Sequence, residues 1–347
     1  MTHFVQLHIL TFYPPANLNR DDTGRPKTAF VGGVERLRIS SQAIKRSVRT
    51  SDVFRAKLAG HVGERTQRFG EEIEAHLGAK GVAAEAAARA ARAVAGLFGK
   101  IVPEVDEHPT RIAQLAFISP QEREAAFTLA EGIAAGQEAP ADASGLLLRI
   151  DTAADIAMFG RMLADNPDFN REAAVQVAHA ITTHRVAVED DFYTAVDDLK
   201  TPAEDAGAGF VGELGFGSGV FYLYVCIDRS LLLRNLDGEG TVANVALAAL
   251  VEALATVSPR GKQASFASRA RASYILAERG DGQPRTLAAA FLRPARGDDL
   301  MQESINALNS FRDKMDAAYG PSTDEPSVLD VQAGTGSLAA IVSYVTG

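Results

Sequence analysis

A cluster of basic side chains within residues 18–50 is the feature that most restricts how this chain can fold. Between Arg20 and Arg49 the sequence has eight basic residues and three acidic ones, a local charge of +5, whereas the 347-residue chain carries −9. Like charges this close repel one another, so they favour the surface and a bound anion. A solvated charged face without a ligand is the alternative for one such helix taken alone.

The same segment predicts a basic strand followed by a basic helix. Apolar and basic residues alternate over 36–39, which is typical of a half-buried strand. Either Ser40 or Ser41 can cap the helix that follows. One stripe of that helix holds Ala43, Ile44, Ser47 and Val48, and its other side presents Lys45, Arg46 and Arg49. A helix N-terminus with hydroxyl groups and nearby guanidinium groups is a site for phosphate oxygens.

A second basic stretch covers residues 260–296. It has eight basic residues and two acidic ones, a local charge of +6, so the rest of the chain outside both stretches carries −20. Positive charge is therefore concentrated in two places. Such polarity suits a protein that holds an anionic strand on one side and repels it elsewhere.

Composition indicates a soluble globular protein without catalytic machinery. The chain is 46% hydrophobic, no apolar run approaches the ~20 residues of a membrane span, and the N-terminus lacks a signal-peptide pattern, so we expect a cytoplasmic location and no membrane partner. The single cysteine, Cys226, lies in an apolar run and reads as a buried thiol. The spacing of His179 and His184 favours structural roles over zinc ligation, and no nucleophile motif or P-loop occurs. We therefore expect no enzyme activity, no catalytic residues, no metal and no cofactor.

Helices and strands alternate along the chain in a way that suggests a discontinuous α+β fold. Residues 4–10 predict a strand that ends before Pro14 and Pro15, and the strand and helix after it suit a ferredoxin-like or RNA-recognition-motif opening. An insertion of helices follows, and strands then return. The expected helices are 82–97, 121–133, 153–163, 171–181, 242–257 and 305–319, and the later expected strands are 220–228 and 273–277.

Residues 197–219 are rich in glycine. Their glycine density suits a mobile loop or a long hairpin better than a packed element. A G-x-G-x-x-G match begins at Gly207, but no strand leads into it and no helix follows, so we do not interpret it as a dinucleotide site.

Several long motifs are spread over roughly the first two thirds of the chain. They are LNRDD from Leu18, GG at Gly32, RISSQ from Arg38 with Lys45 and Arg46 after it, AHAITTH from Ala178, TAVDDL from Thr194 and SGVFY from Ser218. Together these motifs resemble the CasC family, the repeated backbone subunit of the type I-E CRISPR Cascade complex.

The resemblance implies an RNA-recognition-like palm, an inserted helical fingers domain and a β-hairpin thumb. The expected boundaries are 1–56 for the first part of the palm, 57–179 for the fingers and 180–347 for the second part of the palm, with the thumb at 197–219. The thumb would reach over a neighbouring copy of the chain and press on the bound strand.

The resemblance also implies which residues contact the backbone of a CRISPR guide RNA. A thumb wedge would come from Phe210, Val211 or Leu214. The fingers loop at 136–142 lacks the lysines that contact target DNA in some relatives, so direct DNA contact there is in doubt. The implied RNA-binding residues are Asn19, Arg20, Lys27, Arg38, Ser40, Gln42, Lys45, Arg46 and Arg49, with Lys262 and Arg269 as weaker candidates.

The implied function is a non-catalytic scaffold that polymerises head to tail along the guide RNA with other Cascade subunits. It would present the guide for pairing with target DNA, to which it would bind only through the guide. One alternative is a backbone subunit of the type III kind, in which an Asp of a palm loop cleaves target RNA; Asp21 and Asp22 are the residues to consider, and LNRDD favours loop capping instead. A general single-stranded RNA-binding protein outside any CRISPR system is the third possibility, which gene neighbourhood would decide.

Overall fold

The computed structural model describes residues 4–195, 210–321 and 323–347, and all of their side chains except those of Phe210 and Val211. The chain divides into two compact units, each discontinuous in sequence. Unit 1 comprises Met1–Phe54, Val177–Ile227 and Leu247–Gly347, and unit 2 comprises Arg55–Gln176 and Asp228–Ala246. The domain boundaries expected from the sequence stay a prediction; these units differ from them in joining Asp228–Ala246 to the helical part.

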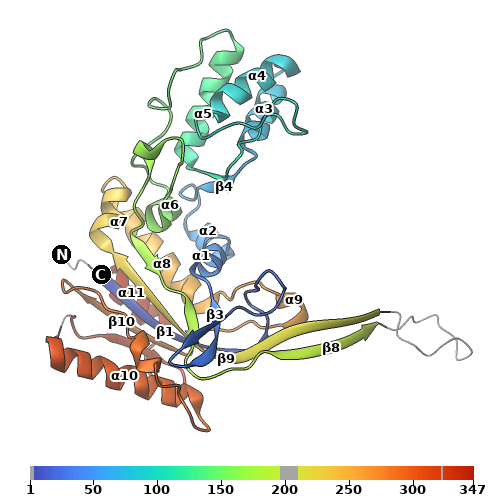
Figure 1. Ribbon diagram of the computed structural model, residues 1–347. Helices are drawn as coiled ribbons and strands as arrows, with labels where there is room; N and C mark the ends of the chain where they lie inside the picture. Colours follow the sequence, from blue (N-terminus) through green and yellow to red (C-terminus); the bar gives the residue numbers. More distant parts are fainter. Residues whose placement is uncertain (1–3, 196–209, 322) are drawn as a thin grey trace, which may run out of the picture. The chain divides into compact units, whose positions relative to one another are not determined.

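The main feature is a large sheet, and the fold class is mixed α+β. Nine strands of the described residues form it, in the order β11-β10-β1-β9-β7-β3-β2, with β6 and β8 also paired to β9 (Figure 1). The registers of β1 with β10 and of β3 with β7 are antiparallel. The strands are β1 (Phe4–Ala16), β2 (Thr28–Val31), β3 (Val34–Ile39), β6 (Val175–Val177), β7 (Ala180–Thr182), β8 (Glu189–Ala195), β9 (Phe210–Asp228), β10 (Tyr274–Gly280) and β11 (Ser327–Asp330).

Strand β1 is longer than the sequence predicts. It continues through Pro14 and Pro15, which were expected to end it. Its pairing with β10 ends at Leu10, so β10 requires no amide hydrogen from either proline.

Strand β9 is 19 residues long and belongs to two structures at once. Its first part forms a hairpin with β8, in register from Ala195 opposite Phe210 to Glu189 opposite Phe216. Its second part pairs with β7 inside the sheet, where Ile181 lies opposite Tyr222. Figure 1 shows the hairpin extending well beyond the rest of the sheet.

The sequence predicted a mobile loop or a long hairpin for this glycine-rich segment, and its described part forms the hairpin. A Cβ atom on Gly217 would lie 2.7 Å from the Leu37 side chain, and one on Gly219 would lie 2.8 Å from His184. A larger residue at either position would therefore displace a neighbouring side chain. Residues 196–209 of the expected thumb lie outside the described residues.

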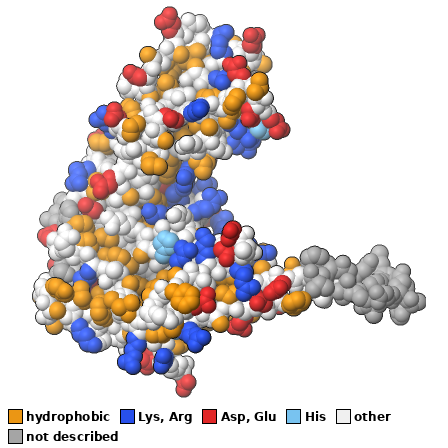
Figure 2. Space-filling model, in the orientation of Figure 1, with side chains coloured by type: hydrophobic (Ala, Val, Ile, Leu, Met, Phe, Trp, Pro, Cys, Tyr) orange, Lys and Arg blue, Asp and Glu red, His pale blue; other side chains and the backbone are white. Residues whose placement is uncertain are grey.

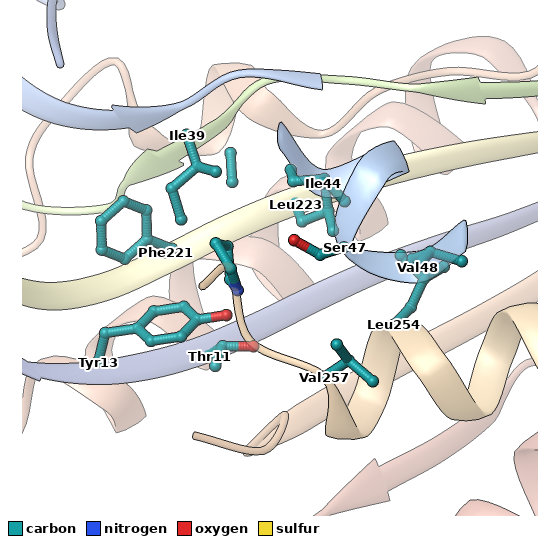
Figure 3. A pocket seen from close by; sticks show the side chains of 12 residues that line it. Thr11, Tyr13, Ile39, Ile44, Ser47, Val48, Phe221, Leu223, Leu254 and Val257 are labelled. Atoms are coloured by element: carbon teal, nitrogen blue, oxygen red, sulfur yellow. The ribbon is translucent and has the colours of Figure 1, made fainter. Parts of the chain in front are cut away.

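Helices cover both faces of the sheet in unit 1. On one face, α10 (Leu300–Tyr319) packs Ile305 and Leu308 against Leu10 and Tyr222. Phe221 points the other way because side chains alternate along a strand. It lies in a small cavity of about 30 Å³ beneath α1 (Ser41–Arg49) and the end of α8 (Gly240–Thr256), as Figure 3 shows. The remaining elements here are α9 (Gln263–Phe266), η2 (Ala288–Phe291) and α11 (Leu338–Thr346).

Unit 2 is mainly helical and has its own core. Phe69, Ile73, Leu77, Val94 and Ile133 are at its centre. Three of the expected helices, 82–97, 121–133 and 153–163, are confirmed as α4, α5 and α6. The elements of this part, with α2 at the start, are α2 (Asp52–Lys57), β4 (Glu64–Thr66), α3 (Phe69–Ala79), α4 (Ala84–Ala95), β5 (Ala116–Ile118), α5 (Pro120–Ala134), α6 (Ala154–Phe159), η1 (Pro167–Phe169) and α7 (Arg229–Asn235).

One predicted helix is wrong. Residues 171–181 contain the short strands β6 and β7 instead. Alanine-rich sequence with alternating valines suits either structure, and pairing with β9 decides the outcome.

Candidate nucleic-acid interface

The N-terminus of α1 is built by Ser40 and Asn19. The Ser40 hydroxyl accepts a hydrogen bond from the Ala43 amide at 3.3 Å, so Ser40 is the N-cap and Ser41 is the first helical residue. The Ser40 amide donates to the Asn19 side-chain oxygen at 2.8 Å. Asn19 thereby ties the preceding loop to the start of the helix.

The basic side chains of α1 lie on the side predicted from the sequence. Ile44 and Val48 are buried under the helix. Gln42 and Arg46 are exposed and Lys45 is half-buried, so burial lowers the pKa of the Lys45 ammonium group. Arg49, near the helix C-terminus, is also half-buried.

Lys27 and Arg38 lie beside Asn19. The Lys27 amide donates to the Asn19 carbonyl and the Arg38 amide donates to the Lys27 carbonyl, both at 2.8 Å. The three residues line one small pocket. The structure therefore brings together four of the predicted residues, Asn19, Lys27, Arg38 and Ser40, at the start of α1. Lys45 lies on the same helix.

His179 joins this group, although the sequence predicted a structural role for it. It is exposed, and its Nδ1 lies 2.8 Å from the Arg38 guanidinium. Because arginine only donates, Nδ1 accepts this hydrogen bond. Partial burial, with the charges of Arg38 and Lys27, lowers the pKa of the imidazole, which keeps it neutral. His179 directly precedes β7. The sequence could not predict this position, because residues 171–181 were expected to form a helix.

Arg36 does not belong to the exposed basic face. Its side chain is fully buried, and it donates to the carbonyls of Thr182 at 3.0 Å and Phe291 at 2.8 Å. The sequence predicted that the basic residues of 36–39 face outward. This prediction is wrong for Arg36. Arg36 links β3 to β7 and η2 instead of meeting a ligand.

A glycine brings the second basic stretch to the same face. A Cβ atom on Gly261 would lie 2.2 Å from the Leu18 carbonyl oxygen, so only glycine allows this approach. Lys262, the next residue, is exposed and adopts the left-handed region with φ 47°. It lies at the start of α9, close in sequence to the contact with the Asn19 loop.

Arg269 is further along this loop and lines a larger pocket of about 340 Å³. Arg260 and Arg271 line the same pocket, near the C-terminal end of α1, where Arg260 approaches the Thr50 carbonyl. None of the three arginines forms an ion pair with any residue that the structure describes. Arg285 and Arg279 of the same stretch differ, since they pair with Glu278 and Asp324.

The loop before β2 is held by its own carboxylate. Asp21 accepts hydrogen bonds from the Thr23 hydroxyl and amide and from the Arg25 amide, and the Thr23 bonds lower the pKa of its carboxyl group. This is the loop-capping role that the sequence suggested. Arg20, beside it, is exposed.

The remaining predicted residues are placed as follows. Leu214 is half-buried on β9, whereas the side chains of Phe210 and Val211 lie outside the described residues. Cys226 is buried, as expected. His184 is buried too: its Nε2 accepts from the Val220 amide and its Nδ1 donates to the Arg185 carbonyl.

Among the described residues, no group of three His, Cys, Asp or Glu side chains is arranged to hold a metal ion. Over the same residues, no helix combines the length and apolar character that crossing a bilayer requires.

Polar and basic side chains lie at both ends of α1. Asn19, Lys27 and Arg38 lie on its N-terminal side, and the arginine pocket lies at its C-terminal side. Lys262 follows Gly261, which contacts the Leu18 backbone. Figure 2 shows Lys and Arg side chains gathered on the face of unit 1 from which the hairpin extends. Spaced cations, amide groups at a helix start and a nearby neutral imidazole suit a phosphate backbone rather than a small molecule.

Comparison with known proteins gives a consistent result. The family model described as "CT1975-like protein" matches residues 5–341. A chain of a structure named "CRISPR RNA-guided surveillance complex, pre-nicking" is 29% identical, with TM-score 0.86 over 99% of both chains. A chain of a second structure, "CRISPR RNA-guided surveillance complex", is 25% identical, with TM-score 0.64 over 99% of this chain and 98% of the other. No curated protein matches.

Proposed function

This chain belongs to the CT1975-like family, which confirms the resemblance to CasC, and from that premise we propose that it binds the guide RNA of a CRISPR surveillance complex. The observation that carries this proposal is the set of cations at both ends of α1. A phosphate backbone needs several contacts spaced along a groove, and they need not read sequence because base pairing does so.

We extend the proposal to a scaffold of several copies along one guide. Unit 1 would be the RNA-recognition-like palm, the helical unit the fingers, and the β8–β9 hairpin the thumb. Other subunits of the complex would bind at the ends, and target DNA would meet the chain through the guide. The fold match over nearly the whole chain to surveillance-complex subunits supports this assignment.

The test of RNA binding is neutralisation of α1. Changing Lys45, Arg46 and Arg49 together to Ala should weaken RNA binding for every sequence. If each contacts one phosphate of a single strand, the log-log salt slope should fall by about 0.7 per contact, or about 2 in all. A matched control changes Arg89, Lys100 and Lys314, which are exposed; the first two belong to unit 2, and Lys314 belongs to α10 on the other face of the sheet. Affinity and slope that are equal in both variants would refute the phosphate contacts.

We also propose that the chain is not a nuclease. Asp21 uses one carboxylate oxygen to hold its own loop, which supports a structural role. The protein with guide RNA, complementary target RNA and Mg²⁺ should leave the target intact. Site-specific cleavage that Asp21→Ala abolishes would establish the type III alternative instead.

A further inference from the structure

Phe30 exposes its aromatic ring at the edge of the sheet. The residue is 80% exposed, and β2, which carries it, is the last strand in the order of the sheet that the structure describes. Single apolar residues on a protein surface are common and need no partner. Phe30 is informative because the backbone around it is held firmly and because it adjoins the candidate interface.

Two arginines fix the backbone on both sides of Phe30. The buried Arg36 donates to the Val31 carbonyl at 3.4 Å, and Arg38 donates to the Thr28 carbonyl at 3.3 Å. The strand therefore cannot rotate to bury the ring without breaking both hydrogen bonds.

The turn after β2 lies against the backbone of Leu292. A Cβ atom on Gly32, which has φ 63°, would overlap the Leu292 carbonyl oxygen. The ribbon of β2 and β3 is thus anchored at its turn as well as along its length. A rigid, exposed ring loses little conformational entropy when it binds, which is the property of a preformed contact site.

Phe30 lies on the face of this ribbon that continues into the candidate interface. It shares that face with Thr28 because side chains alternate along a strand, and Leu37 lies opposite Thr28. Leu37 lines the small pocket at the start of α1 together with Asn19 and Lys27. Phe30 is three residues beyond Lys27, which is about 10 Å along an extended chain. Proteins that hold single strands combine cations along the phosphates with aromatic rings under the bases, and Phe30 supplies such a ring beside the cations.

Glu35 decides which part of a nucleotide fits beside this ring. It lies opposite Phe30 in the register of β2 with β3, so the two Cβ atoms are about 5 Å apart on one face. Glu35 is half-buried and forms no ion pair with any residue that the structure describes. Its carboxylate repels a phosphate but accepts a hydrogen bond from an exocyclic amino group of adenine, cytosine or guanine. Uracil offers carbonyl oxygens in place of that amino group.

We propose that Phe30 and Glu35 form a platform for one nucleobase of the strand that this chain binds. The Phe30 ring stacks on the base, and the Glu35 carboxylate accepts a hydrogen bond from its amino group. The inference rests on the proposed function, to which it adds a base contact and a preference for amino-bearing bases over uracil. A protein that packs on the ring is the competing partner, and continuity with the cations at the start of α1 favours a base.

A fluorescence measurement tests the stacking directly. The sequence contains no tryptophan, so Phe30→Trp introduces the only one, and a base stacked on it quenches its emission. At concentrations that saturate binding, we expect a short cytidine RNA to quench the emission. An abasic strand of the same length keeps the phosphates and should leave it unchanged. Tyr319→Trp, at the exposed C-terminal end of α10, is the control and should respond to neither strand.

Affinity measurements test the energetic contribution of both residues. Phe30→Ala and Phe30→Leu should each weaken RNA binding by about tenfold, because leucine keeps apolar surface but has no ring to stack. The salt dependence and the urea unfolding curve should stay as in wild type, since no charge is removed and the ring is exposed. Wild type should bind oligocytidine about threefold or more tightly than oligouridine, and Glu35→Ala should abolish this preference.

The outcomes separate the inference from the proposed function. Equal quenching of Phe30→Trp by the abasic strand would overturn the stacking. Wild-type RNA affinity in Phe30→Leu would also overturn it, and is the result expected if a protein packs on the ring. A cytidine preference that survives Glu35→Ala would overturn the role of the carboxylate. In these three cases RNA binding stands, whereas a wild type that binds no RNA refutes the proposed function and the inference with it.

Discussion

Replacing Arg36 by Met tests the conclusion that a residue inside the basic cluster serves stability alone. Methionine keeps an unbranched apolar stem but removes the guanidinium. That group is fully buried and forms no ion pair with the described residues. Three backbone carbonyls accept from it, those of Thr182, Phe291 and, at 3.4 Å, Val31.

The magnitude follows from the two shorter hydrogen bonds. Each buried carbonyl that loses its donor costs about 1 to 3 kcal/mol, so the free energy of unfolding should fall by about 2 to 6 kcal/mol. Removing a buried charge without a carboxylate partner acts in the opposite direction, because burial already lowers the pKa of this guanidinium. We therefore expect a value in the lower half of that range, which is still a large part of a typical domain stability.

Urea unfolding followed by circular dichroism measures the loss, and Arg38→Met on the same strand is the control. Arg38 is half-buried and faces His179, so its replacement should change the unfolding free energy by about 1 kcal/mol or less while weakening RNA binding. If Arg36→Met lost less than about 1 kcal/mol and weakened RNA binding as much as Arg38→Met, Arg36 would be a ligand contact and the assignment would fail.

Three further predictions concern other contacts. Gly261→Ala puts a Cβ 2.2 Å from the Leu18 carbonyl, so urea unfolding should show a loss of about 1 to 3 kcal/mol and RNA titration a lower affinity; two unchanged values would contradict the close approach. Ser40→Ala should cost about 1 kcal/mol of unfolding free energy, whereas Ser40→Asp should keep the cap yet weaken RNA binding, and equal affinity in the two variants would contradict phosphate contact at the helix start. Burial lowers the pKa of His8; burial would raise that of Glu278, but hydrogen bonds from His8 and Arg285 hold it well below its usual range. The unfolded chain therefore binds more protons, so stability should fall as pH drops below about 6.5 and again below about 4.5. Glu278→Gln should reduce the second step in acid titrations of unfolding, and an unchanged second step would contradict the role of Glu278.

The local structure of α1 was predictable because its signals are short-range. A serine cap and apolar residues at helical spacing fix both the start of the helix and its buried face. Local signals also located α4, α5, α8 and α10, which are long segments rich in residues of high helix propensity. The start of a helix and its buried face depend on residues that are close together in the sequence, so they can be predicted without knowing the fold.

The errors occur where distant residues decide. Arg36 is buried because the Thr182 and Phe291 carbonyls, far away in the chain, need a donor. Residues 171–181 form strands because β9 offers partners to them. Gly217 and Gly219 of β9 lie close to Leu37 and His184, which are distant in sequence, so no local pattern could indicate these contacts.

Part of the candidate site was predictable from charge alone and part was not. The clustering of arginines and lysines predicted a site for an anion, but it could not separate cations that face solvent from those that face other parts of the protein. Arg25, Arg36 and Arg285 are all engaged within the chain. These arginines can be recognised only when the fold shows which carbonyl or carboxylate groups lie beside each guanidinium group.

Because β9 is one unbroken strand of 19 residues, the hairpin and the centre of the sheet are mechanically continuous. A pull on the hairpin along this strand acts as shear on its pairing with β7, where Ile181 faces Tyr222 and Thr182 faces Phe221. Ladder hydrogen bonds run across the strands, so such a force loads them together instead of opening them one at a time. Slip by one residue would also turn every buried side chain of β9 to the wrong face. A force on the hairpin would therefore be transmitted to the centre of the sheet through β9 itself.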